Sequence, residues 1–137
     1  MTINIPNLQA LPSTAQTIIN QLGDKRVITL TGNLGAGKTT LVKALAQHLG
    51  TTETVSSPTY SLVNEYHYGN NIIYHLDLYR LETLDEALAI GIEDYLYSGN
   101  YCFVEWANII APLLPNNAAH ITITANPNQT RTLTLDN

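Results

Sequence analysis

Apolar residues recur along the chain in two patterns, which predict buried strands and an amphipathic helix. The continuous apolar run RVITLT at 26–31 is typical of a strand buried on both faces. Residues 38–49 carry apolar side chains at helical spacing and are followed by Gly50, so they predict a helix with a glycine stop. A second apolar run, YCFVEWA at 101–107, predicts another buried strand.

Two further segments carry helix-start signals. Ser13 and Gln16 have the spacing of a capping box and predict a helix over 13–23. Residues 83–97 open with TLDE, a second capping box, and contain Gly91, so we expect two short helical turns broken near that glycine.

Alternating and turn-separated runs predict two hairpins. Residues 59–79 read as two strands joined at the GNN of 69–71. The alternating segments at 120–125 and 130–135 flank NPNQ and predict a closing hairpin. Strands and helices in this order predict a three-layer α/β fold with a mixed central sheet.

Composition narrows the class of protein. The 137 residues suit a single domain over 1–137. A net charge of -5 with only six Lys and Arg argues against strong unaided binding to nucleic acid, which depends on neutralising phosphates. The single cysteine, Cys102, excludes a disulfide framework within the chain and is expected in the core. No signal-peptide pattern and no apolar stretch of membrane-spanning length is present, so we expect a cytoplasmic protein.

The turn between the first buried strand and the helix matches a phosphate-binding motif. GNLGAGKT, from Gly32 to Thr39, fits G-x-x-x-x-G-K-[ST] at every fixed position. Glycines let successive backbone N–H groups point at a phosphate, and the helix adds its positive N-terminal end. Lys38 can reach the β- and γ-phosphates, and the Thr39 hydroxyl can coordinate Mg²⁺. A glycine-rich connector without a ligand is the alternative, which the strand before and the helix after disfavour.

A phosphate loop of this kind works with acidic residues at the ends of neighbouring strands. Asp77 follows IIYHL and Glu105 follows CFV, so each stands at the end of an apolar strand. Either carboxylate can bind the metal or position water, and each can alternatively cap a turn. His75, inside an apolar strand, is interpreted as a satisfied core histidine, and Arg80 as a surface or structural ion-pairing residue.

Four segments together go beyond a generic phosphate loop. GNLGAGKTT, SSPTYSLVNEY, YHLDLYRL and VEW, in this order and at this spacing, resemble the TsaE family over about residues 10–135. The resemblance implies a small bacterial P-loop ATPase. Such proteins act with TsaD and TsaB in the threonylcarbamoyl modification of adenosine next to the anticodon of certain tRNAs.

The same resemblance implies the ligands and their residues. ATP and Mg²⁺ are the expected ligands, with Thr39, Glu105 and Asp77 as the metal site and Lys38, Asp77 and Glu105 as the catalytic groups. Ser57 to Thr59 resemble a nucleotide-sensing switch loop. The residues implied to contact the nucleotide are Gly32, Gly35, Ala36, Gly37, Lys38, Thr39, Thr40, Thr59, Trp106, Thr17 and Arg131. From the residues alone, Thr59 remains either a γ-phosphate sensor or an ordinary strand residue, and Trp106 either a site wall or core.

The residues disfavour two other nucleotide-dependent functions and leave a third open. A small-molecule kinase usually has a lid with several arginines, but no Arg or Lys lies between Leu81 and Cys102. A GTP-binding switch is disfavoured because N-K-x-D and D-x-x-G are missing. A nucleotide-gated binding module with incidental hydrolysis shares every residue with the ATPase and stays open. With few arginines, intrinsic turnover is expected to be slow.

Overall fold

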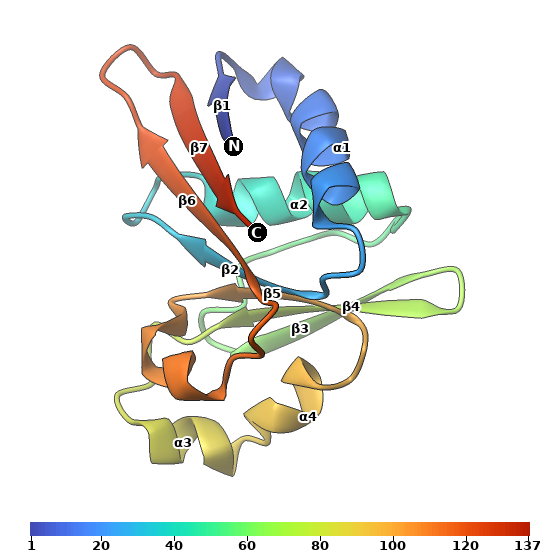
Figure 1. Cartoon of the computed structure of the whole chain (residues 1–137), viewed down its shortest axis with the longest axis vertical. Helices are drawn as coiled ribbons and strands as arrows, with labels where there is room; N and C mark the ends of the chain where they lie inside the picture. Colours follow the sequence, from blue (N-terminus) through green and yellow to red (C-terminus); the bar gives the residue numbers. More distant parts are fainter.

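A seven-stranded mixed sheet runs through the middle of the molecule (Figure 1). The computed structural model describes all residues, 1–137. The strand order is β1-β7-β6-β2-β5-β4-β3, with β2 parallel to both β5 and β6 and with β4 parallel to β5. The strands are β1 (Thr2–Ile5), β2 (Val27–Thr31), β3 (Val63–Tyr68), β4 (Asn71–Asp77), β5 (Tyr101–Glu105), β6 (Ala119–Ala125) and β7 (Arg131–Asp136).

Helices cover both faces of this sheet, so the predicted three-layer α/β architecture with a mixed sheet is confirmed (Figure 1). On one face lie α1 (Leu11–Leu22) and α2 (Lys38–Leu49), preceded by the 3₁₀ helix η1 (Leu8–Ala10). On the other face lie α3 (Leu84–Ala89), α4 (Ile92–Leu96) and the 3₁₀ helix η2 (Ala107–Leu113). Two apolar clusters of 22 and 10 buried residues fill the spaces between the layers. None of these helices is long and apolar enough to cross a membrane.

The two continuous apolar runs form the buried centre of the sheet, as expected. All five residues of β5 are buried, and four of the five in β2 are. Alternate side chains serve the two clusters: Phe103 packs on the α1–α2 side, whereas Cys102 packs on the α3–α4 side. Burial raises the pKa of the Cys102 thiol to about 12, in keeping with the predicted core role.

The local turn and capping signals were mostly correct. Both predicted hairpins are present, as the antiparallel pairs β3–β4 and β6–β7. Thr83 and Glu86 form the predicted capping box at the start of α3, and Gly91, with a φ of 77°, separates α3 from α4.

The predicted start of the first helix was wrong. Helix α1 begins at Leu11, and Ser13 lies inside its first turn, where its Oγ donates to the Ala10 carbonyl at 3.0 Å. The side chain that caps this region is Asn7, which accepts from the Ala10 N–H at the start of η1. Strand β1 was not predicted either. It pairs with β7, so its formation depends on residues at the other end of the sequence.

This topology brings the carboxyl ends of three strands together. Leu30 of β2 and Asp77 of β4 are both paired in register with Glu105 of β5. The loop after β2 therefore lies at the same sheet edge as the two predicted acids. Ligands of open α/β sheets bind at this edge.

Close packing at the exit of β2 explains the first glycine of the loop. A Cβ on Gly32 would lie 2.7 Å from the Ile123 carbonyl oxygen of β6. We therefore expect Gly32→Ala to lower the free energy of unfolding by about 1–3 kcal/mol, as overpacking does, in urea denaturation. Gly69→Asn is the control, because Gly69 has a φ of 58° with open space around it and asparagine tolerates that conformation. An alanine at 32 that left stability unchanged would show that β2 and β6 can separate there without cost.

Candidate active site

The loop between β2 and α2 presents unpaired backbone donors. Gly35 and Gly37 have φ values of 80° and 107°, which favour glycine. No backbone or side-chain acceptor of the chain takes a hydrogen bond from the N–H groups of Gly37, Lys38, Thr39 or Thr40. Because these groups open helix α2, they form a ready binding site for an anion.

Lys38, the first residue of α2, is buried beneath this loop. Only 5% of the residue is exposed. Its ammonium group donates to the Gly32 carbonyl and lies 4.0 Å from the centroid of the Trp106 ring. Burial lowers the pKa of Lys38, while the nearby carboxylates of Glu105 and Asp77 oppose that shift. The charge is thus held by a carbonyl dipole, an aromatic face and two acids, without a direct ion pair.

Thr39, the next residue, contacts the first of the two acids. Its Oγ1 donates to Glu105 Oε2 at 3.1 Å. His75 Nε2 lies 2.5 Å from the same oxygen, and both His75 and Glu105 are buried. His75 was correctly expected to be buried, but it is not satisfied, since its Nδ1 has no hydrogen-bond partner. The contact between His75 and Glu105 was not anticipated from the sequence.

Asp77, the second acid, is tied to the proposed switch loop. The Thr59 hydroxyl donates to Asp77 Oδ2 at 2.9 Å, and the Tyr79 N–H donates to Oδ1 at 3.0 Å. Only 4% of Asp77 is exposed. Thr59, which lies 18 residues earlier in the chain, is therefore brought to the same strand end as the acids.

The donor set at this edge suits a hard divalent cation. Thr39, Asp77 and Glu105 offer hydroxyl and carboxylate oxygens, the ligands that Mg²⁺ prefers. The chain has no group of three or more His, Cys, Asp or Glu side chains that could hold a metal ion. A cation held here would therefore need further oxygen ligands, such as phosphate oxygens or water.

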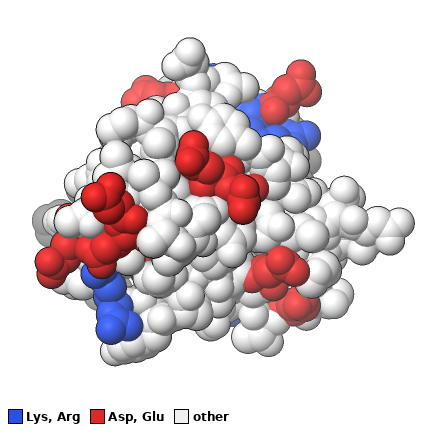
Figure 2. Space-filling model, turned by 90° about the horizontal axis from the view of Figure 1, so that it is seen from below, with Lys and Arg blue, Asp and Glu red and all other residues white.

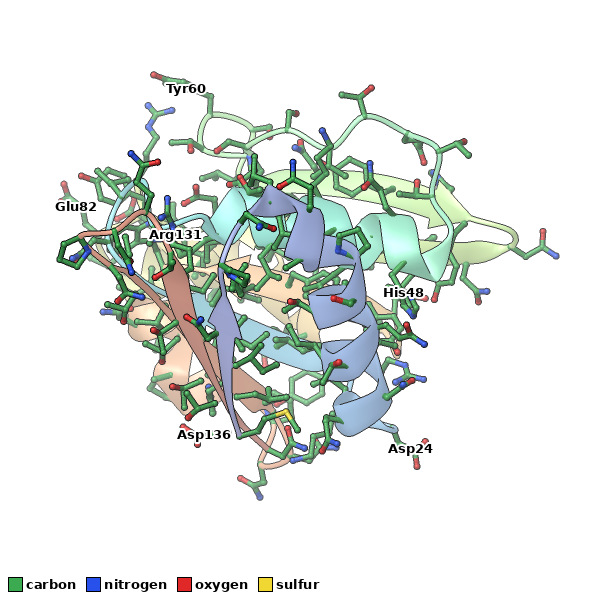
Figure 3. All side chains as sticks on the ribbon, turned by 90° about the horizontal axis from the view of Figure 1, so that it is seen from above. Asp24, His48, Tyr60, Glu82, Arg131 and Asp136 are labelled. Carbon is green, nitrogen blue, oxygen red and sulfur yellow. The ribbon has the colours of Figure 1, made fainter.

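The segment 56–62, which contains the switch loop, is anchored at both ends, and between the anchors Pro58 is buried and Thr59 half-buried. At its start, the Tyr66 hydroxyl accepts from the Ser56 N–H and donates to the Ser56 carbonyl. At its end, Leu62 adopts a φ of 69° and accepts from the Asp77 N–H. Tyr60 between them is 85% exposed and points away from the body of the molecule (Figure 3).

Two aromatic contacts complete the surroundings of the acids. Trp106 follows Glu105 with a φ of 56°, and its ring centroid lies 4.9 Å from that of Tyr79, so it forms a wall of the site beside Lys38.

Arg80 is exposed at the surface, as expected, but the expectation of an ion pair there was wrong. Its guanidinium lies 5.2 Å from the Tyr60 ring centroid, and it forms no salt bridge.

A cavity of about 580 Å³ opens beside the phosphate loop. Its walls come from residues 5–11, from the start of α2 and from the turn between β6 and β7. Arg131 lines it and donates from Nε to the Ala36 carbonyl at 3.0 Å, which ties β7 to the loop (Figure 3). No sequence pattern marks the polar lining residues Asn7, Gln9, Asn128 and Gln129, because they come from segments far apart in the chain.

Of the implied nucleotide contacts, Ala36, Gly37, Thr40 and Arg131 line this cavity, and Thr17 is not brought to it. Thr17 lies on the exposed side of α1, and its Oγ1 donates to the Ser13 carbonyl within the same helix. It does not line the cavity.

Comparisons with a family model and with known proteins point to the same family. Residues 5–133 match the family model described as threonylcarbamoyl adenosine biosynthesis protein TsaE. The chain is 44% identical over 97 residues to the tRNA threonylcarbamoyladenosine biosynthesis protein TsaE of Bacillus subtilis, covering 71% of this chain and 60% of that protein. It is also 38% identical to the protein of that name from Treponema pallidum, covering 78% and 79% of the two chains.

The Bacillus subtilis YdiB crystal structure superposes with a TM-score of 0.76 at 31% identity, covering 98% of this chain and 83% of that one. The solved relative supports the P-loop NTPase-type fold. The matched regions span less than two thirds of some relatives: 60% of the Bacillus subtilis protein and 56% of the Haemophilus influenzae protein.

Burial of the Lys38 charge predicts opposite effects on stability and binding. Lys38→Met keeps the length of the side chain and removes an ammonium group whose pKa is lowered by burial. The variant should unfold at an equal or higher urea concentration at pH 7, yet bind ATP about tenfold to a hundredfold more weakly, the loss of a charge-assisted contact, by calorimetry. Because the folded pKa is the lower one, any stability advantage of the variant should shrink as the pH rises towards the ordinary value of 10.5. A variant clearly less stable than the wild type at pH 7 would contradict this account.

Proposed function

This chain belongs to the TsaE family of tRNA threonylcarbamoyladenosine biosynthesis, and we propose that it binds ATP with Mg²⁺ and hydrolyses it in the cytoplasm, together with TsaD and TsaB. The observation that carries the proposal is the buried Lys38 beneath four unpaired N–H groups, with Thr39 against Glu105. Membership of the family supports a role in tRNA threonylcarbamoyladenosine biosynthesis. The chemistry of the site supports a nucleoside triphosphate.

Each group in the site has a role in this proposal. The N–H groups of the loop and Lys38 hold the phosphates, because they supply fixed dipoles and a charge at one place. Thr39, Glu105 and Asp77 would hold Mg²⁺, directly or through water, with their hydroxyl and carboxylate oxygens. When bound, the ion would neutralise charge that develops on the β- and γ-phosphate oxygens.

Hydrolysis also needs an oriented water molecule. One of the two carboxylates, Asp77 or Glu105, accepts a hydrogen bond from that water and orients its oxygen towards the γ-phosphorus. Thr59 contacts Asp77, so the switch loop can respond when the γ-phosphate arrives or leaves. The cavity lined by Arg131 has the size, and the mixture of apolar and polar lining residues, to accept the nucleoside.

Few cations are available to speed this reaction. Arg131 contacts the phosphate loop through Ala36, and Arg80 lies against Tyr60. Turnover by the chain alone should therefore be slow, and a partner that orders the switch loop or adds a cation would raise it. The exposed Tyr60 at the tip of that loop is well placed to meet such a partner.

The surface charge favours protein partners over direct, strong tRNA binding. Viewed from the α3–α4 side, the molecule carries several groups of acidic side chains and few basic ones (Figure 2). The acids in this region are Glu82, Asp85, Glu86, Glu93 and Asp94. A phosphate backbone would be repelled by such a surface.

A nucleotide-gated binding module remains the second candidate, and one observation favours it. The groups proposed to hold the nucleotide also bond to one another: Lys38 contacts Gly32, Thr39 contacts Glu105, and Thr59 contacts Asp77. Nucleotide binding would therefore rearrange the site and the switch loop even if hydrolysis were incidental.

Turnover measurements separate the two candidates. We expect ATP hydrolysis by the purified chain to be slow, and to rise tenfold or more with TsaB and TsaD, because a positioned partner group can accelerate phosphoryl transfer by roughly 10³–10⁵. Phosphate release is measured with the chain alone, with both partners, and with the partners alone.

Lys38→Ala is the control for this measurement and should abolish the increase. Unchanged turnover on adding the partners, with nucleotide-dependent binding to them, would favour the gated module. Normal hydrolysis by Lys38→Ala would contradict the assignment of the site.

A further inference from the structure

His75 combines full burial with incomplete hydrogen bonding. The residue has no exposed surface, and its Nδ1 is the one buried side-chain nitrogen or oxygen in the chain that lacks a hydrogen-bond partner. Leaving a buried polar atom unpaired is costly, by about 1–3 kcal/mol. Its neighbours Ile73 and Phe103 are apolar core residues, so an apolar side chain would serve packing at this position better.

The contact of the other ring nitrogen, Nε2, accounts for a histidine at this position despite the unpaired Nδ1. Nε2 lies 2.5 Å from Glu105 Oε2, and a carboxylate oxygen can only accept, so the ring carries its donated proton on Nε2. His75 and Asp77 lie on the same face of β4, since they are two residues apart, and Asp77 is in register with Glu105 of β5. The imidazole thus approaches Glu105 from a position two residues before the end of β4.

We propose that His75 is a positioning residue that holds the Glu105 carboxylate in the orientation needed to bind the Mg²⁺ of a Mg·ATP complex. This inference rests on the proposed function. Glu105 has three side-chain torsions, and only Thr39 and His75 bond to its carboxylate. Thr39 lies in the first turn of α2, at the end of the phosphate loop, where a bound nucleotide would change its contacts. His75 belongs to a central strand of the sheet, so its bond does not depend on the state of the loop.

Both bonds to Glu105 fall on Oε2, which leaves Oε1 without a partner in the chain. A carboxylate fixed through one oxygen presents the other in a defined direction. Hydrogen-bonding partners of metal ligands act in this way, and their loss typically costs about 10–100-fold in metal affinity or activity.

Two amide substitutions separate this role from packing. The Gln side-chain nitrogen can reach the position of imidazole Nε2, whereas the Asn side chain is one methylene shorter and ends near the position of Nδ1. His75→Gln therefore keeps a donor for Glu105, and His75→Asn places the same chemical group out of reach. Both bury one amide, so their effects on the core should be similar.

The experiment measures ATP affinity by calorimetry in Mg²⁺ and in EDTA, with thermal unfolding of each variant as the check on folding. For His75→Asn we expect the Mg²⁺-dependent gain in ATP affinity to fall by about tenfold, with affinity in EDTA within about twofold of the wild type, because the phosphate loop does not contact His75. His75→Gln should recover most of the gain.

Three outcomes would overturn the proposal. The first is that His75→Asn keeps the full Mg²⁺-dependent gain in ATP affinity of the wild type, and the second is that it loses ATP affinity equally in Mg²⁺ and in EDTA. The third is a folded His75→Gln variant whose Mg²⁺-dependent gain is no larger than that of His75→Asn. If the wild-type chain itself bound no ATP in either condition, the proposed function would fail as well, and that result is distinct from the other three.

Discussion

The burial of one positive charge, that of Lys38, is the constraint on which the rest of the site depends. An ammonium group is costly to remove from water, and in this chain burial outweighs the nearby acids and lowers the pKa of Lys38. The surrounding structure limits that cost with the Gly32 carbonyl, the Trp106 face and the fields of Glu105 and Asp77. The charge is thus kept where a triphosphate would complete its coordination.

The other polar groups at this edge of the sheet are likewise stabilised by contacts within the site. Thr39 donates to Glu105 and Thr59 donates to Asp77, so residues from four segments of the chain leave the edge of the sheet polar and largely hydrogen-bonded. His75 Nδ1 is the exception, and we attribute it to the requirement for a donor on Glu105. Functional residues of this kind reduce stability, which the two apolar clusters on either side of the sheet offset.

The sequence predicted those features of the fold and site that depend on residues close together in the chain. The buried runs of β2 and β5, both hairpins, the phosphate loop and the strand-end acids could all be recognised from contiguous stretches of the sequence. Contacts between distant segments could not. Strand β1 needs β7, the cavity needs three separate walls, and the role of His75 appears only when β4 lies beside β5. Ser13 misled because α1 already begins at Leu11, so the Ser13 hydroxyl lies within the first turn and donates to the Ala10 carbonyl instead of capping the helix.

The most direct test of the account is a crystal structure with Mg²⁺ and a non-hydrolysable ATP analogue. The account predicts the analogue's phosphates within the loop, Lys38 Nζ moved from the Gly32 carbonyl to a phosphate oxygen, and Glu105 directed at the metal while still bonded to His75. An analogue bound away from this loop, with Lys38 still on Gly32, would contradict the central claim that this buried charge is held ready for a nucleotide.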